Sequence, residues 1–347
     1  IGSVRYRDTT RVLDAERVTY YGLSDRVVAE EDVRLERLQS GATLEAPRVE
    51  FFRSATEGNR TLATGRPHMT LPTGGRGSQP FLVDADVTEF VGEEEAFARG
   101  NVEIRRPDLD ATADSARFDA AGTGVLYGRP VVRGQAFTLT GDSVLARFAD
   151  DELREVRAFG AASASGRDFE LQSELVTAEV AGGEVERLWA FGDGRSIAVS
   201  GTFQLAGDSL DFAFTAGVLD SIGSVGDAVS VETEPHVPGT PLSEVPLSLE
   251  AGSTWLTGDT IRAFFTVAPS DSTSVKPDPE PESLVATGAA RSFYASVRDS
   301  TRSLDPSRNY MLGRRIEILF RDGEPSEVVA VDAIGVYLEP DTEGGGG

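Results

Sequence analysis

A short pattern recurs along this chain, and it constrains the fold more than any other feature of the sequence. A small residue is usually followed by a polar one, then by a variable residue and alternating apolar positions. The pattern occurs nine times, beginning at Ala15, Ala46, Ala85, Ala113, Gly141, Ser173, Gly207, Gly258 and Gly313. Successive starts lie 28 to 55 residues apart, so the sequence indicates tandem units with insertions in the later ones.

Each unit has a second half, in which a hydrophobic pair and a small residue lead through a glycine turn into another alternating segment. The glycine turns at Gly65 and Gly100, for example, precede Met69 and Val102. Alternation with a period of two is typical of half-buried strands, and helical periodicity is scarce in this chain. A unit of two or three strands cannot bury an apolar face alone, whereas stacked units join their faces. We therefore predict an all-β fold, an elongated stack of strands such as a solenoid or a long jelly roll.

Side chains alternate between the two faces of a strand, so residues of the same parity should share one face. The apolar set that we expect to point inward is Val49, Phe51, Met69, Leu71, Val102, Ile104, Phe118, Leu210, Phe212, Phe214, Ile316, Ile318 and Phe320. Periodicity by itself predicts a core for these residues and does not assign them a ligand.

Two stretches interrupt the repeats, the proline-rich residues 234–241 and residues 268–282 with their Ser, Thr and Pro. Both are typical of surface loops or linkers. We divide the chain into β repeats over 1–231, a proline-rich insertion with a connecting strand over 232–257, two further units over 258–340 with a loop at 268–282, and a flexible tail over 341–347.

Charge and composition exclude several classes of function. The formal net charge is −24, which repels polyanions, so we expect no nucleic-acid partner. The chain has no cysteine, so disulfides and thiolate chemistry are excluded within it. It has no apolar run long enough for a membrane-spanning helix. Since the sequence begins at Ile1 without a leader pattern, we expect any signal peptide or anchor to lie outside this chain.

Catalytic and metal-binding motifs are weak. The two histidines, His68 and His236, have no supporting triad or multi-histidine pattern. Residues 108–114 have the early spacing of a calcium-binding EF-hand loop, but Ala113 stands where its sharp turn needs glycine. Acidic residues mostly occupy turns, where solvation explains them. We predict a protein that is not an enzyme, with no catalytic residue, no metal site and no cofactor.

The repeats resemble a known family. The signature of a small residue, Asp and alternating apolar positions, followed by an acidic turn and a strand of the Glu-x-Val-x-Ala-x-Gly type, is similar to the OstA/LptA-like repeats of lipopolysaccharide-transport proteins. The best matches are 141–159 and 313–331, with 183–190 close behind and 62–71 as a closing strand. The resemblance covers nearly the whole chain.

The resemblance implies a taco-like β jelly roll, in which two splayed sheets surround an open apolar trough. It implies a periplasmic lipid-binding protein that shields the acyl chains of lipopolysaccharide or a related lipid during outer membrane biogenesis. The inward set above would then line the lipid groove. The alternative is a cell-surface β-solenoid, an adhesin or scaffold with a closed interior, or less readily a polysaccharide-acting β-helix enzyme.

Open sheets end in strands with unpaired backbone groups, which a partner can extend. We predict such edges at Val18–Tyr20, at Val33–Leu35 and at Ile334–Leu338. They would suit strand addition by cell-envelope proteins of the same fold, or end-to-end association of this chain with itself. Charges such as those of Glu30, Glu31 and Asp32 favour the opposite outcome, a monomer.

Overall fold

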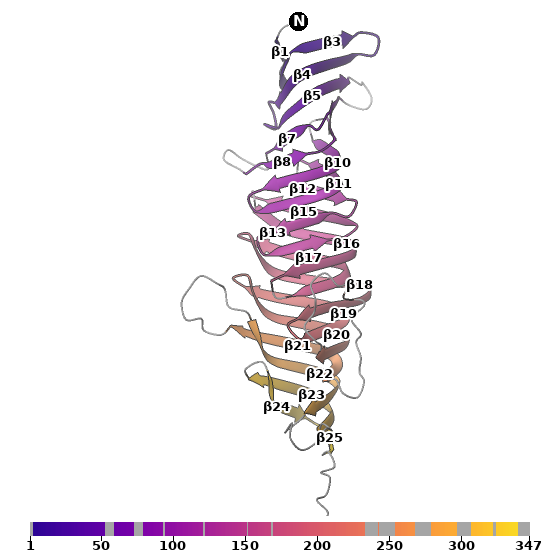
Figure 1. Ribbon diagram of the computed structural model, residues 1–347, viewed down its shortest axis with the longest axis vertical. Helices are drawn as coiled ribbons and strands as arrows, with labels where there is room; N and C mark the ends of the chain where they lie inside the picture. Colours follow the sequence, from indigo (N-terminus) through magenta and orange to yellow (C-terminus); the bar gives the residue numbers. More distant parts are fainter. Residues whose placement is uncertain are drawn as a thin grey trace, which may run out of the picture. The chain divides into compact units, whose positions relative to one another are not determined.

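The computed structural model is built of β-strands, which confirms the predicted all-β class (Figure 1). It describes residues 3–52, 59–72, 79–92, 94–120, 122–150, 152–167, 169–232, 242, 254–267, 279–296, 307–321 and 324–338. No α-helix occurs in these ranges, and therefore none that is long and apolar enough to cross a membrane. The chain divides into two units, the first formed by residues 1–162 and 179–184 and the second by 163–178 and 185–347.

In the first unit, antiparallel strands are stacked as successive rungs (Figure 1). Its strands are β1 (Val4–Arg7), β2 (Arg11–Ala15), β3 (Arg17–Tyr21), β4 (Arg26–Arg37), β5 (Thr43–Phe52), β6 (Arg60–Thr64), β7 (His68–Leu71), β8 (Phe81–Asp84), β9 (Val87–Val91), β10 (Glu95–Arg106), β11 (Leu109–Asp119), β12 (Thr123–Tyr127), β13 (Val131–Gly134), β14 (Phe137–Thr140) and β15 (Ser143–Ala149).

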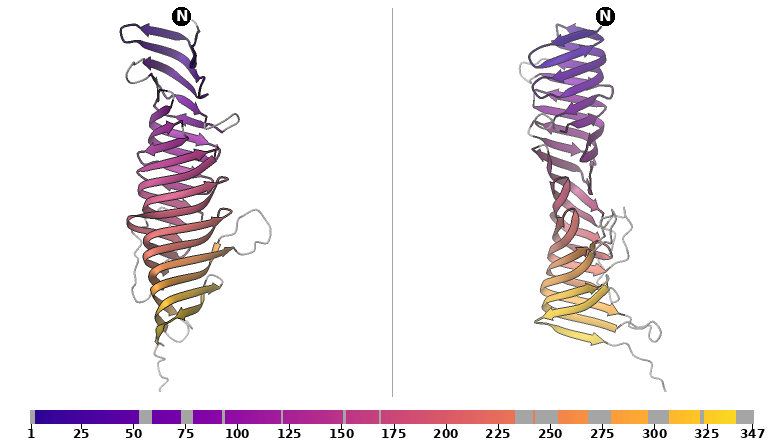
Figure 2. Two further views of the ribbon diagram at one scale, coloured as in Figure 1. Left: turned by 180° about the vertical axis from the view of Figure 1, so that it is seen from behind. Right: turned by 90° about the vertical axis from the view of Figure 1, so that its left-hand side faces the viewer.

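Three strands contribute residues to both units: β16 (Glu152–Gly166), β17 (Glu170–Ala181) and β18 (Glu184–Ser200). The second unit also contains β19 (Phe203–Thr215), β20 (Val218–Glu232), β21 (Trp255–Val267), β22 (Pro279–Ser296), β23 (Ser307–Arg321), β24 (Glu324–Val331) and β25 (Ile334–Leu338). Figure 2 shows the strands of each unit from two further sides.

The long strands bend in the middle, so that each has two arms with different neighbours. The first arm of β10 pairs with β9 and its second arm pairs with β8. The register against β11 shifts between Arg99 and Val102, where Gly100 and Asn101 both adopt positive φ, 75° and 48°. Likewise, β4 pairs with β3 before its shift and with β2 after it, and β23 pairs with β24 and β25 through its two arms. The arms on the two sides of the bends therefore form two layers in each unit.

The bends are built from a glycine and an aspartate on neighbouring strands. At Gly128, where φ is +79°, a Cβ atom would lie 2.3 Å from Oδ2 of Asp114, so only glycine leaves room for the carboxylate. The same close approach pairs Gly100 with Asp86, Gly160 with Asp142, Gly226 with Asp208 and Gly288 with Asp259. These aspartates are the polar residues of the recurring sequence pattern. The pattern therefore marks the position of a bend.

Apolar side chains fill the space between the layers. In the first unit, the ring of Phe81 on β8 lies 5.8 Å from that of Phe118 on β11 and 4.8 Å from that of Phe148 on β15, across the two layers. In the second unit, the rings of Phe203 on β19 and Phe320 on β23 lie 5.2 Å apart. Burying a side chain of this size stabilises the fold by about 1.5–3 kcal/mol, so these residues are a main source of stability.

The outer faces are charged and partly cross-linked by ion pairs. On β4 and β5, Arg48 pairs with Glu30 and with Glu50, and Arg26 also reaches Glu50 at 3.3 Å. Cross-strand pairs of opposite charge suit a solvated sheet face. The pKa of Arg48 is raised, chiefly by its hydrogen bond to Glu50.

Two predictions about particular segments are wrong. Val33–Leu35 is not an edge, because Arg34 pairs with Asp14 on β2 on one side and with Glu45 on β5 on the other. The predicted loop 268–282 does not extend to its end, because β22 begins at Pro279. Residues 279–281 pair with β21, and the described pairing with β23 begins only at Ser283. The missing proline N–H groups therefore cost no described bond to β23. The proline-rich stretch 234–241, loop residues 268–278 and the tail 341–347 lie outside the described residues.

Candidate functional site

The predicted inward residues lie between the layers, in β5, β7, β10, β11, β19 and β23. Most of them are buried, namely Val49, Phe51, Met69, Val102, Ile104, Phe118, Leu210, Phe212, Ile316 and Ile318. Leu71, Phe214 and Phe320 are half-buried. Those in β5, β7, β10 and β11 belong to the first unit, and those in β19 and β23 to the second. The predicted alternation is therefore present, and the residues form the interior of both units.

At the N-terminal end of the first unit, the interior opens into a cleft of about 300 Å³, here called the N-terminal cleft. Its apolar lining includes Tyr6, Leu13, Val18, Tyr20, Val27 and Phe51. Leu13 and Phe51 also belong to the buried core, with 2% and 7% of their surface exposed. The cleft is therefore continuous with the apolar interior.

A second cleft, of about 460 Å³, lies in the first unit between the ends of the strands opposite the bends, and we call it the seam cleft. One layer contributes Ala42, Leu71 and Phe81 to it, and the other contributes Phe90 and Phe118. Its lining also includes the acidic residues Glu94, Glu95 and Asp119. The seam cleft thus has an apolar floor and an acidic border.

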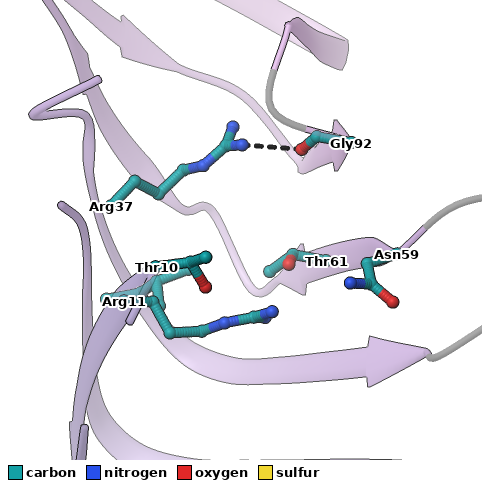
Figure 3. Close-up of a pocket in the computed structure, with 7 residues that line it drawn as sticks. Thr10, Arg11, Arg37, Asn59, Thr61 and Gly92 are labelled. Atoms are coloured by element: carbon teal, nitrogen blue, oxygen red, sulfur yellow. Dashed lines mark hydrogen bonds between the residues drawn. The ribbon is translucent and has the colours of Figure 1, made fainter. Parts of the chain in front are cut away.

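Between these clefts lies a polar gap of only about 10 Å³, here called the arginine gap, which is large enough for about one water molecule. Arg11 lines both the arginine gap and the N-terminal cleft, while Arg37 lines both the arginine gap and the seam cleft. In Figure 3, the Arg37 guanidinium extends to the carbonyl oxygen of Gly92, to which it donates a hydrogen bond of 2.6 Å. The side chain of Arg11 extends in the same direction as that of Arg37, toward Asn59 and Thr61 (Figure 3).

Both arginines lie against aromatic rings inside the fold. The guanidinium carbon of Arg37 is 4.6 Å from the ring centre of Phe90, and that of Arg11 is 5.3 Å from the ring centre of Phe51. A third arginine, Arg106 at the end of β10, lies over two phenylalanine rings and pairs with Asp108 at 2.8 Å. Cation–π contacts of this kind stabilise a guanidinium that is removed from water.

The charge of Arg11 is partly balanced by Asp8, whose carboxylate is 3.4 Å from Nε of Arg11. The backbone N–H and the hydroxyl of Thr10 each donate to Oδ1 of Asp8 at 2.8 Å. Burial raises the pKa of the Asp8 carboxyl. The hydrogen bonds from Thr10 and from the backbone N–H of Arg11, together with the charge of Arg11, lower it by more, so the pKa lies below its ordinary value. Asp8 is therefore ionised wherever the protein is folded near neutral pH.

The residues that we considered for catalysis or metal binding lie elsewhere. Nδ1 of His68 is 3.0 Å from Oδ1 of Asp84, and Arg105 pairs with the other oxygen of the same carboxylate. Asp108 pairs with Arg106, and Asp114 packs against Gly128. His236 lies outside the described residues. No cluster of metal-binding side chains is found in the part of the chain that the structure describes.

The inward arginines were not among the predicted site residues. Arg37 has 7% of its surface exposed and stands two positions after the buried Leu35, while Arg106 stands two positions after Ile104. Because residues two positions apart on a strand share a face, this spacing from inward apolar residues was the sequence signal that could have placed both arginines inside. No protein-family model matches the sequence, and no curated protein matches it significantly.

Proposed function

We propose that this protein is a periplasmic lipid carrier, which shields the acyl chains of lipopolysaccharide or a related lipid in an open trough during export to the outer membrane. Its two layers would be the walls of a jelly roll of the OstA/LptA-like kind. The proposal is supported by the resemblance of the repeats and by the apolar clefts of the first unit.

The observation that carries the proposal is the N-terminal cleft, because it gives an apolar chain access to the interior. Its volume of about 300 Å³ is at the lower end of the range of ligand pockets, and about twice that of an apolar cavity that binds benzene. Each buried CH₂ group contributes about 0.8 kcal/mol, so a few methylenes in the cleft suffice for measurable binding. The seam cleft supports an opening along the side opposite the bends.

The edge strands support a partner of the same fold. Among the described pairings, β1 and β3 each pair on one side only, as do β24 and β25. All five residues of β25 are exposed, with Ile334 at 75% and Leu338 at 58%. Strand addition at these edges, by an envelope protein or by a second copy of the chain, would prolong the trough.

A fluorescent fatty acid tests the proposal directly. Val18 lines the N-terminal cleft. Its neighbour Thr19, which pairs with Val28 on β4, points to the other face of the sheet. We expect Val18→Trp to fill the cleft and weaken binding of the probe about tenfold, and Thr19→Trp to leave it unchanged. Absence of binding by the unmodified protein, or equal affinity of both folded variants, would reject the lipid-carrier proposal.

A second candidate is the scaffold with a closed interior, which the ring contacts between the layers favour. Phe81 meets both Phe118 and Phe148, so aromatic side chains occupy part of the space that a lipid would need. A scaffold would bind no acyl probe at any concentration below micelle formation, and Val18→Trp would then have no ligand to displace.

A further inference from the structure

The seam cleft of the first unit is large enough for a ligand of its own. Its volume of about 460 Å³ lies within the range of small-molecule pockets, about 300–1,000 Å³. The rings of Phe81 on β8 and Phe118 on β11 come from different layers and meet with their centres 5.8 Å apart. Both residues line the cleft, so their contact gives it an apolar floor.

The acidic residues of the cleft stand together on one wall. Glu94 precedes β10, Glu95 begins it, and Asp119 ends β11, so all three belong to the same layer. The register of β10 and β11 places Glu95 directly opposite Asp119. Like charges that face each other across a strand pair destabilise a sheet. A cation bound at this border would relieve their repulsion.

The cations near this wall do not outnumber the carboxylates. Among the described residues that line the cleft, Arg37 is basic, and its guanidinium lies over the ring of Phe90 and donates to the carbonyl of Gly92 at the arginine gap (Figure 3). Outside the lining, Arg117 pairs with Glu95. Three carboxylates therefore stand beside two guanidinium groups, in a chain of net charge −24, and this balance favours a positively charged ligand.

An apolar floor with an acidic wall suits an amphiphile with a cationic head. We propose that the seam cleft binds an alkyl amine or an alkyl quaternary ammonium compound. The alkyl group lies on Phe81 and Phe118, and the ammonium lies beside Glu94 and Asp119. Carboxylates attract the ammonium by charge, and aromatic rings attract it through their electron-rich faces. The inference does not rest on the proposed function, because it concerns a different cleft.

The ammonium adds to the contacts of the border and replaces none of them. The backbone N–H of Thr123 donates to Oδ1 of Asp119 at 2.9 Å, and Arg117 pairs with one oxygen of Glu95. Each carboxylate has two oxygens, with about four sites that accept hydrogen bonds. The ion pair and the turn after β11 can therefore remain in place when the ligand is bound.

Calorimetric titration of the full chain tests the inference with three ligands of the same chain length. These are octyltrimethylammonium, 1-octanol and octanoate, each at a concentration where it is monomeric. We expect the ammonium compound to bind about tenfold or more tightly than octanol, and octanoate to bind most weakly. Glu94→Gln with Asp119→Asn should remove this preference while the affinity for octanol stays unchanged. Asparagine keeps an oxygen for the N–H of Thr123, so the variant preserves the turn.

Two kinds of control place the ligand. Glu36→Gln with Asp110→Asn removes the same charge from exposed positions that line neither cleft, and it should keep the preference. Leu71→Trp fills the seam cleft and should weaken binding of the ammonium compound about tenfold. Val18→Trp fills the N-terminal cleft instead and should leave that affinity unchanged.

Each result decides the inference separately from the lipid-carrier proposal, which the fatty-acid probe tests. A preference for the ammonium compound that is lost in the variant of Glu94 and Asp119, and kept in that of Glu36 and Asp110, supports the inference. Loss in both would mean that the net charge of the chain attracts the ligand, and the inference would fail. It also fails if the ammonium compound does not bind, if octanol binds as tightly, or if Val18→Trp weakens its binding and folded Leu71→Trp does not.

Discussion

Replacing Gly128 with alanine should destabilise the first unit far more than the same change at an uncrowded glycine. Gly128 has a φ of +79°, and an added Cβ would meet Oδ2 of Asp114 at 2.3 Å and its Cβ at 2.5 Å. A left-handed conformation costs alanine about 1–2 kcal/mol, and overpacking adds about 1–3 kcal/mol. We expect a total of about 2–5 kcal/mol.

Gly182 supplies the matched control, because it also has a positive φ, +60°, but nothing lies within 4 Å of its added Cβ. Gly182→Ala should therefore cost only the conformational part, about 1–2 kcal/mol. Native-state hydrogen exchange of the amides in β11, β12 and β13 gives the local opening free energy. In the double variant Gly128→Ala with Asp114→Gly, the overlap disappears, so the double-mutant cycle should show a favourable coupling of about 1–3 kcal/mol. Equal losses at Gly128 and Gly182, or a coupling near zero, would refute the role assigned to the bends.

Further predictions concern the interior and the pH dependence. Phe212 is fully buried, whereas Asp211 faces outward in an ion pair with Arg187. In urea unfolding, Phe212→Ala should lower the free energy of unfolding by about 3–5 kcal/mol and Asp211→Ala by less than about 1 kcal/mol. Similar losses in the two variants would contradict the inward assignment of Phe212. Burial raises the pKa of Asp84, but the hydrogen bonds and charges of His68 and Arg105 outweigh it, so the pKa is lowered. The stability that this carboxylate contributes is then present above its unfolded pKa of about 3.9 and is lost as the pH falls through the folded value. Asp84→Asn should therefore destabilise the protein at pH 7, with the difference from the unmodified protein closing at acid pH; a difference independent of pH would contradict this.

The sequence predicted the strands and their inward faces well, because alternation directly reports which side chains are buried. Leu210 and Phe212, for instance, lie inside as their parity required. The sequence also contained the recurring aspartates. Their role depends on contact with glycines about 14 to 29 residues further along the chain, such as that of Asp114 with Gly128. A single sequence does not show such pairs. The meaning of the pattern was therefore found only in the structure.

The candidate site was predicted only in part. The apolar lining at Phe51 was recognised, whereas Arg11 and Arg37 were not, because a charged residue at a strand end is usually solvated. The predicted edge at Val33–Leu35 failed because the short segments 4–7 and 11–15 pair ahead of it, and segments of four or five residues carry little periodic signal.

The central claim is that an acyl chain enters the interior of the first unit, and site-specific photocrosslinking tests it most directly. A photoreactive phenylalanine analogue at Phe51 faces the N-terminal cleft, and the same analogue at Glu50 faces the opposite side of β5. The lipid-carrier account predicts that an alkynyl fatty acid crosslinks from position 51 and not from position 50. Equal crosslinking from both positions, or none from position 51 in a folded variant, would contradict it.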